Sequence, residues 1–294
     1  MHIRDIRSGR VLGWAIIGAT MLVTVFPLCW MLRTAITPAG DVFTDNFSLW
    51  PQHPTLINFK RVVGLTDLAQ TQAAGGSGAH LEFLLYLRNS VIYTTAIVVV
   101  QTMSCAMAGY ALARLKFRGR GMLFGMFVGS LMVPPIFTLL PNFALIKQLG
   151  LLNTFPGLVA PSLLMTPFSI FFLRQFFLSI PHEVEEAALL DGAGRWTVFW
   201  RVVMPMSKGP LMTIALTLSV WSWKDFLWPL LVGPEKDTRV LTAALGLFLQ
   251  QSPNSQPDWT GLMAASTLTA APVFLLLMIF GKRMVNAITF TGVK

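Results

Sequence analysis

The sequence predicts an all-α polytopic membrane protein with six transmembrane helices, and three observations support this fold class. Of the 294 residues, 54% are hydrophobic and only 12% are charged, which is too apolar for an ordinary soluble domain. Six runs are apolar enough and long enough to cross a bilayer, which takes roughly 20 residues. The basic residues flank these runs instead of sharing a polar face, so the net charge of +9 does not indicate a nucleic-acid-binding protein.

The six runs follow one another along a single membrane domain that we assign to residues 1–294. They cover residues 11–31, 90–112, 122–140, 155–178, 211–231 and 262–280. The first run follows Arg4, Arg7 and Arg10, as the apolar part of a signal peptide does. Because this run is longer than a signal core, we expect an uncleaved first span.

The distribution of charge predicts the orientation of the chain. With the N-terminus in the cytoplasm, 14 of the 22 basic and 5 of the 13 acidic residues lie inside, which follows the positive-inside rule. Both termini and the loop at 179–208 are then cytoplasmic. The segment at 33–88 becomes the longest outer loop, with a glycine-rich stretch at 72–79. We expect a multi-pass protein of the cell inner (plasma) membrane.

Prolines interrupt several of the predicted spans. Proline inside a membrane helix frees backbone groups, and it marks either a kink near a cavity or a simple packing kink. We expect breaks at Pro134, Pro135 and Pro141 in the third span, at Pro161 and Pro167 in the fourth, and at Pro272 in the sixth.

The most unusual segment follows the fourth span and is charged. Pro181 suits the first turn of a helix, and carboxylates between Glu183 and Glu186 suit the positive end of its dipole. Gly192 and Gly194 permit the positive φ that ends a helix. The pattern predicts a short helix, a sharp bend and a second amphipathic piece over residues 195–203.

In this segment Glu186-Ala187-Ala188, Gly192 and Pro205 match, in type and spacing, the loop motif of the transmembrane subunits of binding-protein-dependent ABC importers. Val202 and Met204 stand where the motif has Ile and Leu. The chain resembles this family over nearly its whole length. Within the family, the chain resembles the carbohydrate branch, and in that branch the shorter maltose-type permease subunit, at residues 108–114, 117–120, 149–154 and 171–177. The tail at 285–294 resembles a variant of the ending of that branch.

The resemblance implies that the loop carries a coupling helix, which in this family sits in a cleft of an ATPase. It assigns polar or ionic contact to Glu186, close approach to Ala187 and Ala188, and the turn to Gly192, while Asp191 caps or solvates the bend. It also implies alternating access, a second permease subunit, two ATP-binding cassette ATPase subunits and an extracytoplasmic solute-binding protein. The solute is expected to be a sugar or a sugar-like molecule, with a polyol or glycerol phosphate as alternatives.

The sequence contains no catalytic constellation. It has no Gly-x-x-x-x-Gly-Lys-Ser/Thr pattern, so we expect a transporter subunit, not an enzyme, with ATP and Mg bound by the partner ATPases. Its four histidines are scattered, which gives no metal site, and Cys29 and Cys105 lie in apolar runs. A self-contained secondary carrier is the alternative, and the absence of a carboxylate at the midplane of a span argues against it.

Two polar stripes are candidates for the substrate pathway. The residues recur at helical spacing, at Ser162, Thr166 and Ser169 on the fourth span and at Thr213, Thr217, Trp221 and Lys224 on the fifth. Small hydroxyl residues in membrane helices usually pack and bond between helices. The functional alternative is a wet cavity, in which Trp221 offers an aromatic face to a sugar ring and Lys224 donates hydrogen bonds near the outer mouth.

Overall fold

The computed structural model describes residues 3–43, 48–73, 81–248 and 257–289. Within these ranges the chain forms helices, turns and irregular segments, and no strand occurs. Contacts divide the chain into two compact units, the first comprising Met1–Leu84 with Ala244–Ala271 and the second comprising Leu85–Ala243 with Pro272–Lys294. The first unit is therefore discontinuous in sequence. In chain order, most of the second unit comes between its two segments.

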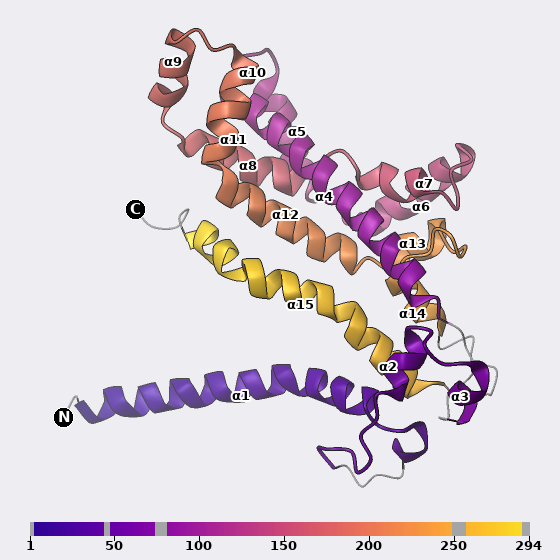
Figure 1. Ribbon diagram of the computed structural model, residues 1–294. Helices are drawn as coiled ribbons and strands as arrows, with labels where there is room; N and C mark the ends of the chain where they lie inside the picture. The colour runs from indigo at the N-terminus through magenta and orange to yellow at the C-terminus, as the bar shows by residue number, and fades with distance from the viewer. Residues whose placement is uncertain (1–2, 44–47, 74–80, 249–256, 290–294) are drawn as a thin grey trace. The chain divides into compact units, whose positions relative to one another are not determined.

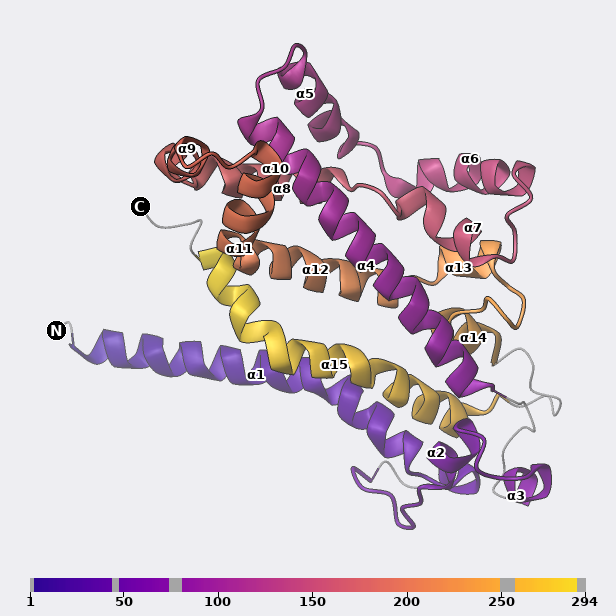
Figure 2. The same cartoon turned by 45° about the horizontal axis from the view of Figure 1, so that its top comes forward.

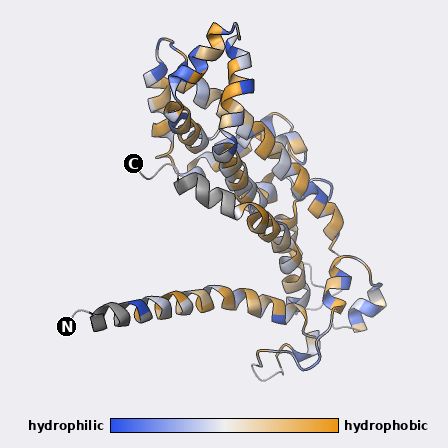
Figure 3. Ribbon diagram, turned by 60° about the vertical axis from the view of Figure 1, so that its left-hand side comes forward, coloured by the Kyte–Doolittle hydropathy of each residue, from blue (hydrophilic) through white to orange (hydrophobic). Residues whose placement is uncertain are grey.

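The first unit begins with α1, a helix over Ile3–Ala35 that contains Pro27 without a break. Apolar side chains such as Leu12 and Trp14 are exposed along it, and hydrophobic colour predominates on this helix in Figure 3. An exposed apolar helix of this length suits a lipid environment. The unit also contains η1 (Ala39–Asp41), α2 (Ile57–Val62), α3 (Leu68–Ala73), most of α14 (Leu241–Phe248) and the first part of α15 (Trp259–Thr289).

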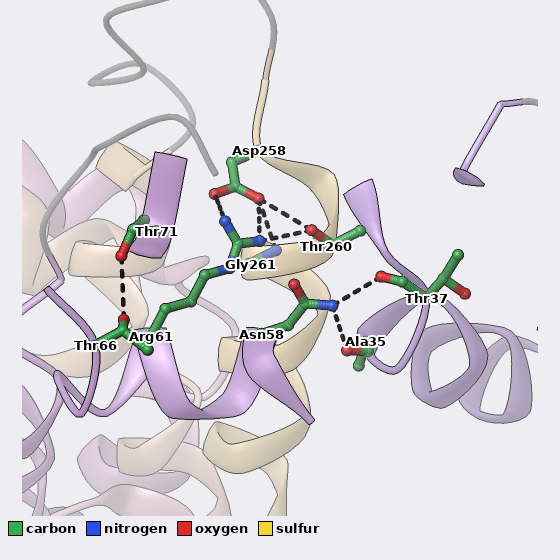
Figure 4. Close-up of polar contacts among 9 residues, drawn as sticks. All are labelled: Ala35, Thr37, Asn58, Arg61, Thr66, Thr71, Asp258, Thr260 and Gly261. Atoms are coloured by element: carbon green, nitrogen blue, oxygen red, sulfur yellow. Dashed lines mark hydrogen bonds and ion pairs between the residues drawn. The ribbon is translucent and has the colours of Figure 1, made fainter. Parts of the chain in front are cut away.

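A buried ion pair joins α2 to the start of α15 within the first unit (Figure 4). The guanidinium of Arg61 donates two hydrogen bonds of 2.7 Å to the two carboxylate oxygens of Asp258. It donates a third, of 2.6 Å, to the hydroxyl of Thr260, and the backbone N–H of Gly261 donates to Asp258 Oδ1. Two parallel N–H···O bonds of this kind fix both distance and orientation.

A buried asparagine closes the end of α1 in the same unit. Asn58 Nδ2 donates 2.8 Å hydrogen bonds to the carbonyls of Ala35 and Thr37, as Figure 4 shows. The last carbonyls of a helix have no partner within the helix, so a neighbouring side chain must bind them when they are buried. The predicted outer loop thus contains an ordered helix, α2, that is bound to α1 and α15.

The second unit contains nearly all of α4, the helices from α5 to α13, and the part of α15 that begins at Pro272. From α4 to α13 the elements are α4 (Phe83–Arg114), α5 (Arg120–Ser130), α6 (Pro135–Gln148), α7 (Phe155–Val159), η2 (Ala160–Ser162), α8 (Pro167–Ser179), α9 (His182–Leu190), α10 (Arg195–Val198), the π-helix η3 (Phe199–Val203), α11 (Met204–Met206), α12 (Lys208–Trp223) and α13 (Leu227–Val232). Both views of the ribbon place α4 beside α8 and α10 (Figures 1 and 2).

Helix α4 is continuous over 32 residues, and the core of the second unit forms against it. Cys105 and Leu112 of α4 pack with Phe177 of α8 and Val198 of α10. Gly109 permits close approach, because a Cβ at this position would lie 3.2 Å from the backbone nitrogen of Arg174. Small residues let membrane helices pack this closely.

Two predicted spans are bent where prolines release backbone groups. The segment α5–α6 turns by 100° before Pro135, and the segment from α7 to α8 turns by 51° before Pro167. A proline ring clashes with the carbonyl four residues earlier, which places each break just ahead of its proline. The expectation of breaks at Pro141 and Pro272 was wrong, because both residues lie inside continuous helices, α6 and α15.

A break that the sequence analysis did not anticipate divides the predicted fifth span into α12 and α13. Pro229 lacks the N–H that would bind the carbonyl of Asp225, and the hydroxyl of Thr242 donates to this carbonyl at 2.5 Å instead. In the described part of the chain three helices are long and apolar enough to cross a membrane, or five if each bent pair forms one span. Helix α12, with 16 residues, is shorter than these.

Candidate functional site

Helix α9 and its C-terminal turn form the charged segment that the sequence singled out. The helix covers His182–Leu190, with Pro181 before it and acidic residues in its first turn. Gly192 has φ +83°, and its N–H donates to the carbonyl of Leu189, while the N–H of Ala193 donates to the carbonyl of Ala188. This pair of bonds is a Schellman motif, which requires the left-handed conformation that glycine tolerates.

The residues after the turn form the second helical piece that the pattern predicted. It consists of α10 and the π-helix η3, and its buried side chains Val198, Phe199 and Val203 face the core. The expectation of positive φ at Gly194 was wrong, because this residue has φ −73° and precedes α10 as extended backbone. A single left-handed residue, Gly192, is sufficient to reverse the chain.

The motif residues of α9 are divided between two faces. Glu186 and Ala187 are exposed, whereas Ala188 packs partly against the core. Asp191 follows the last turn, and its N–H donates to the carbonyl of Ala187. Leu190 on the outer face is 89% exposed. The second unit therefore presents a short helix that carries both an acidic and a large apolar group outward.

Glu185 is the acidic residue that the sequence analysis did not single out, and it is buried. Its Oε1 lies 2.8 Å from Arg114 Nε, and its Oε2 accepts a 3.0 Å hydrogen bond from the hydroxyl of Tyr110. Tyr110 and Arg114 stand one helical turn apart at the end of α4, so both reach the same carboxylate. Their spacing could have indicated a shared partner, but the partner lies about 70 residues away in sequence.

The stripe on the fourth span lies at the bend between η2 and α8. The Thr166 hydroxyl donates to Ser169 Oγ at 2.7 Å, and Ser169 is 2% exposed. The carbonyl of Ser162 accepts a hydrogen bond from the buried side-chain amide of Gln101 on α4. Cys105, one turn further along α4, places its sulfur 3.4 Å from the Thr166 nitrogen. These contacts satisfy backbone groups that the break releases.

The stripe on the fifth span separates into bonded hydroxyls and an exposed aromatic end. The hydroxyls of Thr213 and Thr217 donate to carbonyls four residues earlier, and Thr213 is buried. Trp221 is 63% exposed, and Lys224 Nζ lies 5.2 Å from the centroid of its ring. The two threonine hydroxyls thus bind their own helix. At the end of α12, by contrast, an aromatic face and a cation lie together at the surface of the unit.

Known proteins match the chain over most of its length. The family model described as the binding-protein-dependent transport system inner membrane component matches residues 105–289. The diacetylchitobiose uptake system permease protein NgcG of Streptomyces coelicolor is 31% identical, over 91% of this chain and 83% of the relative. The trehalose/maltose transport system permease protein MalG of Thermococcus litoralis is 29% identical, over 95% of each chain.

A solved structure has the same fold. It is a crystal structure of a bacterial ABC transporter involved in the import of the acidic polysaccharide alginate, and one of its chains matches with a TM-score of 0.81. The match covers 96% of this chain and 98% of that chain, at 20% sequence identity. The arrangement of helices is therefore shared although four residues in five differ.

Proposed function

The chain belongs to the family of inner membrane components of binding-protein-dependent transport systems, and we propose that it forms half of the translocation pathway of an ATP-driven importer. The single observation that carries this proposal is the exposed helix α9 with the Glu186-Ala187-Ala188 motif and its Gly192 turn. In the proposed mechanism α9 is the coupling helix, and it docks in a cleft of an ATPase subunit.

The exposed groups of α9 support this docking role. Glu186 offers a carboxylate for polar or ionic contact, Ala187 permits close approach, and Leu190 offers apolar area. A short helix closed by a Schellman turn has little freedom to bend, so a push on it is transmitted to the helices that hold it. Asp191 lies at the end of the helix and solvates the bend.

The proposed assembly contains a second permease subunit, two ATP-binding cassette ATPases and an extracytoplasmic solute-binding protein. ATP and Mg bind to the ATPase subunits, and this chain needs no cofactor of its own. The solute we propose is a sugar or a sugar-like molecule, because the two relatives are named for diacetylchitobiose and for trehalose and maltose. The ligand retained by the associated binding protein tests this part of the proposal directly.

ATP dependence distinguishes the importer from a secondary carrier. The complete complex in proteoliposomes should take up the ligand of its binding protein only when ATP is supplied on the ATPase side. Uptake without ATP that follows an imposed ion gradient would contradict the importer. Removal of the binding protein is the matched control, because an importer of this class should then lose uptake although ATP is present.

We propose six spans with both termini and the 179–208 loop in the cytoplasm, and cysteine labelling tests this topology. In a background without Cys29 and Cys105, Gln52→Cys should react with an impermeant thiol reagent in spheroplasts, and Thr197→Cys should react only after permeabilisation. Both positions are exposed, whereas Ser207 is buried and makes a poor probe. Labelling of Thr197→Cys from outside would invert the proposed orientation.

A further inference from the structure

Arg114, the last residue of α4, organises the segment that leads into α9. Its Nη1 donates to His182 Nε2 at 2.6 Å, its Nη2 donates to the carbonyl of Ile180, and its Nε lies 2.8 Å from Glu185 Oε1. The guanidinium therefore holds the first turn of α9 against α4 through two hydrogen bonds, to His182 and Ile180, and through a close ion pair with Glu185.

The same carboxylate is also bound by Tyr110. The side chains of Arg114 and Glu185 are 3% and 10% exposed, and the hydroxyl of Tyr110 donates to Glu185 Oε2 at 3.0 Å. The ring of Tyr110 lies 6.0 Å from that of Phe177 and 5.1 Å from that of Phe199, centroid to centroid. Both oxygens of Glu185 are thus engaged by α4, and Tyr110 is itself fixed by packing.

Neighbouring carboxylates do not share this environment. Glu183 and Glu186 are exposed, so they need no partner other than water. Burying an ion pair carries a large desolvation penalty, and replacing one by apolar residues is often neutral for stability. A buried, oriented ion pair of this kind is suited to fixing one helix, here α9, at a defined position on another, here α4.

We propose that Glu185, Arg114 and Tyr110 form the joint through which displacement of α9 is passed to α4. The proposal rests on the proposed docking of α9 on an ATPase, and it makes Glu185 a positioning residue inside the permease. Helix α4 suits the role because it is continuous over Phe83–Arg114, whereas breaks interrupt the helices at Pro135, Pro167 and Pro229.

The opposite end of α4 is also bound to backbone within the second unit. Asn89 Nδ2 donates to the carbonyls of Asp237 and Arg239 at 2.9 Å and 3.0 Å, and the N–H of Leu241 donates to Ser90 Oγ at 2.8 Å. About 24 residues at 1.5 Å each separate the two ends, which is roughly 36 Å. A displacement of Arg114 along the axis of α4 therefore reaches the 237–241 segment across a membrane thickness.

The test compares Glu185→Gln with Glu183→Gln in the complete complex in proteoliposomes. The measured quantity is solute imported per ATP hydrolysed, together with the amount of ATPase that co-purifies. Glu185→Gln should keep its ATPase subunits while the ratio falls about tenfold, because it removes one charge of the buried pair and leaves Arg114 without its ionic partner. Glu183→Gln should leave the ratio within about twofold, as an exposed carboxylate does.

A charge exchange and a conservative variant separate positioning from general damage. Arg114→Glu combined with Glu185→Arg should recover part of the ratio that Arg114→Glu alone loses. If Glu185→Gln does not assemble, Tyr110→Phe tests the joint instead, because its ring still packs. Its ratio of solute imported to ATP hydrolysed should fall about fivefold, as expected for the loss of one hydrogen bond. The wild-type ratio in both Glu185→Gln and Tyr110→Phe overturns the joint.

Two outcomes distinguish failure of the proposed joint from failure of the proposed importer function. Loss of the ATPase subunits from a stable Glu185→Gln complex would assign Glu185 to docking and would overturn the joint, while the importer stands. A wild-type complex that binds no ATPase or imports without ATP would overturn the importer, and the joint with it, whatever the variants do.

Discussion

The hydroxyl of Tyr93 on α4 donates a hydrogen bond of 2.9 Å to Asp225, which lies in the break between α12 and α13. Tyr93 is 2% exposed, so this bond forms away from water. The carbonyl of the same aspartate accepts from Thr242, and Asp225 thereby has partners for both its side chain and its backbone. Two residues of the second unit, Tyr93 and Thr242, thus hold the break in the fifth predicted span.

Replacing Tyr93 with Phe should lower the stability of the second unit. The variant keeps the ring but removes the side-chain donor of the Asp225 carboxylate, and a hydrogen bond to a charged group contributes about 1.5 to 3 kcal/mol. Thermal unfolding of the purified protein in detergent measures the effect. Tyr86→Phe is the matched control, because its hydroxyl lies 3.5 Å from Arg239 Nη1 and makes only a weak contact. Equal unfolding temperatures for the two variants would contradict the prediction.

Gly192 should tolerate substitution far less than Gly194. A Cβ added at either position would have no atom within 4 Å, so space does not distinguish them, but only Gly192 has positive φ. Valine at Gly192 would therefore be strained by about 1 to 3 kcal/mol, and the turn that orients α9 should distort. We expect Gly192→Val to lose co-purifying ATPase and Gly194→Val to retain it. Retention of ATPase by both variants would show that the turn does not position the helix.

Trp221→Ala should lower uptake of the solute if the end of α12 contacts it. The exposed ring offers an apolar face, and loss of one aromatic stacking contact corresponds to about a fivefold loss in affinity. The measurement is the KM for uptake in proteoliposomes, with assembly checked by ATPase co-purification. Trp14→Ala is the control, since Trp14 is 72% exposed on α1. An unchanged KM for Trp221→Ala would exclude this residue from the pathway.

The Arg61–Asp258 pair should show the asymmetry of buried ion pairs. Asp258→Asn leaves the guanidinium of Arg61 without its charged partner, and such a loss costs about 3 to 5 kcal/mol. Arg61→Met combined with Asp258→Leu should unfold at a higher temperature than Asp258→Asn, because no charge stays buried. Asp41→Asn is the control: Asp41 lies 3.5 Å from His53 in an exposed pair, where little change is expected. A double variant less stable than Asp258→Asn would contradict this account.

Local signals in the sequence predicted the local structure well. The prolines, acids and glycine around α9 predicted a short helix, a turn at Gly192 and a second helical piece, since all of these depend on residues within one or two turns. The bends ahead of Pro135 and Pro167 were predicted for the same reason. Pro229 gives an equal local signal for the break at Asp225, because it removes the N–H that would bind the carbonyl four residues earlier.

Contacts between distant segments could not be predicted in this way. Nothing in the first turn of α9 distinguishes Glu185 from Glu183 or Glu186, because the choice depends on which face of the helix meets Arg114. The hydroxyl stripes illustrate the same point. Helical spacing predicts that Thr213 and Thr217 share one face, but spacing does not say that both hydroxyls bind their own helix.

The pairing of Arg61 with Asp258 also sets an order of events during synthesis. The two residues are 197 positions apart, so at 5 to 20 residues per second roughly 10 to 40 s pass between their translation. During this interval Arg61 has no Asp258 to bind, while the whole of Leu85–Ala243 is being made. The first unit is therefore incomplete until the start of α15 has been made, and a ribosome that stalls before residue 258 leaves Arg61 without its carboxylate.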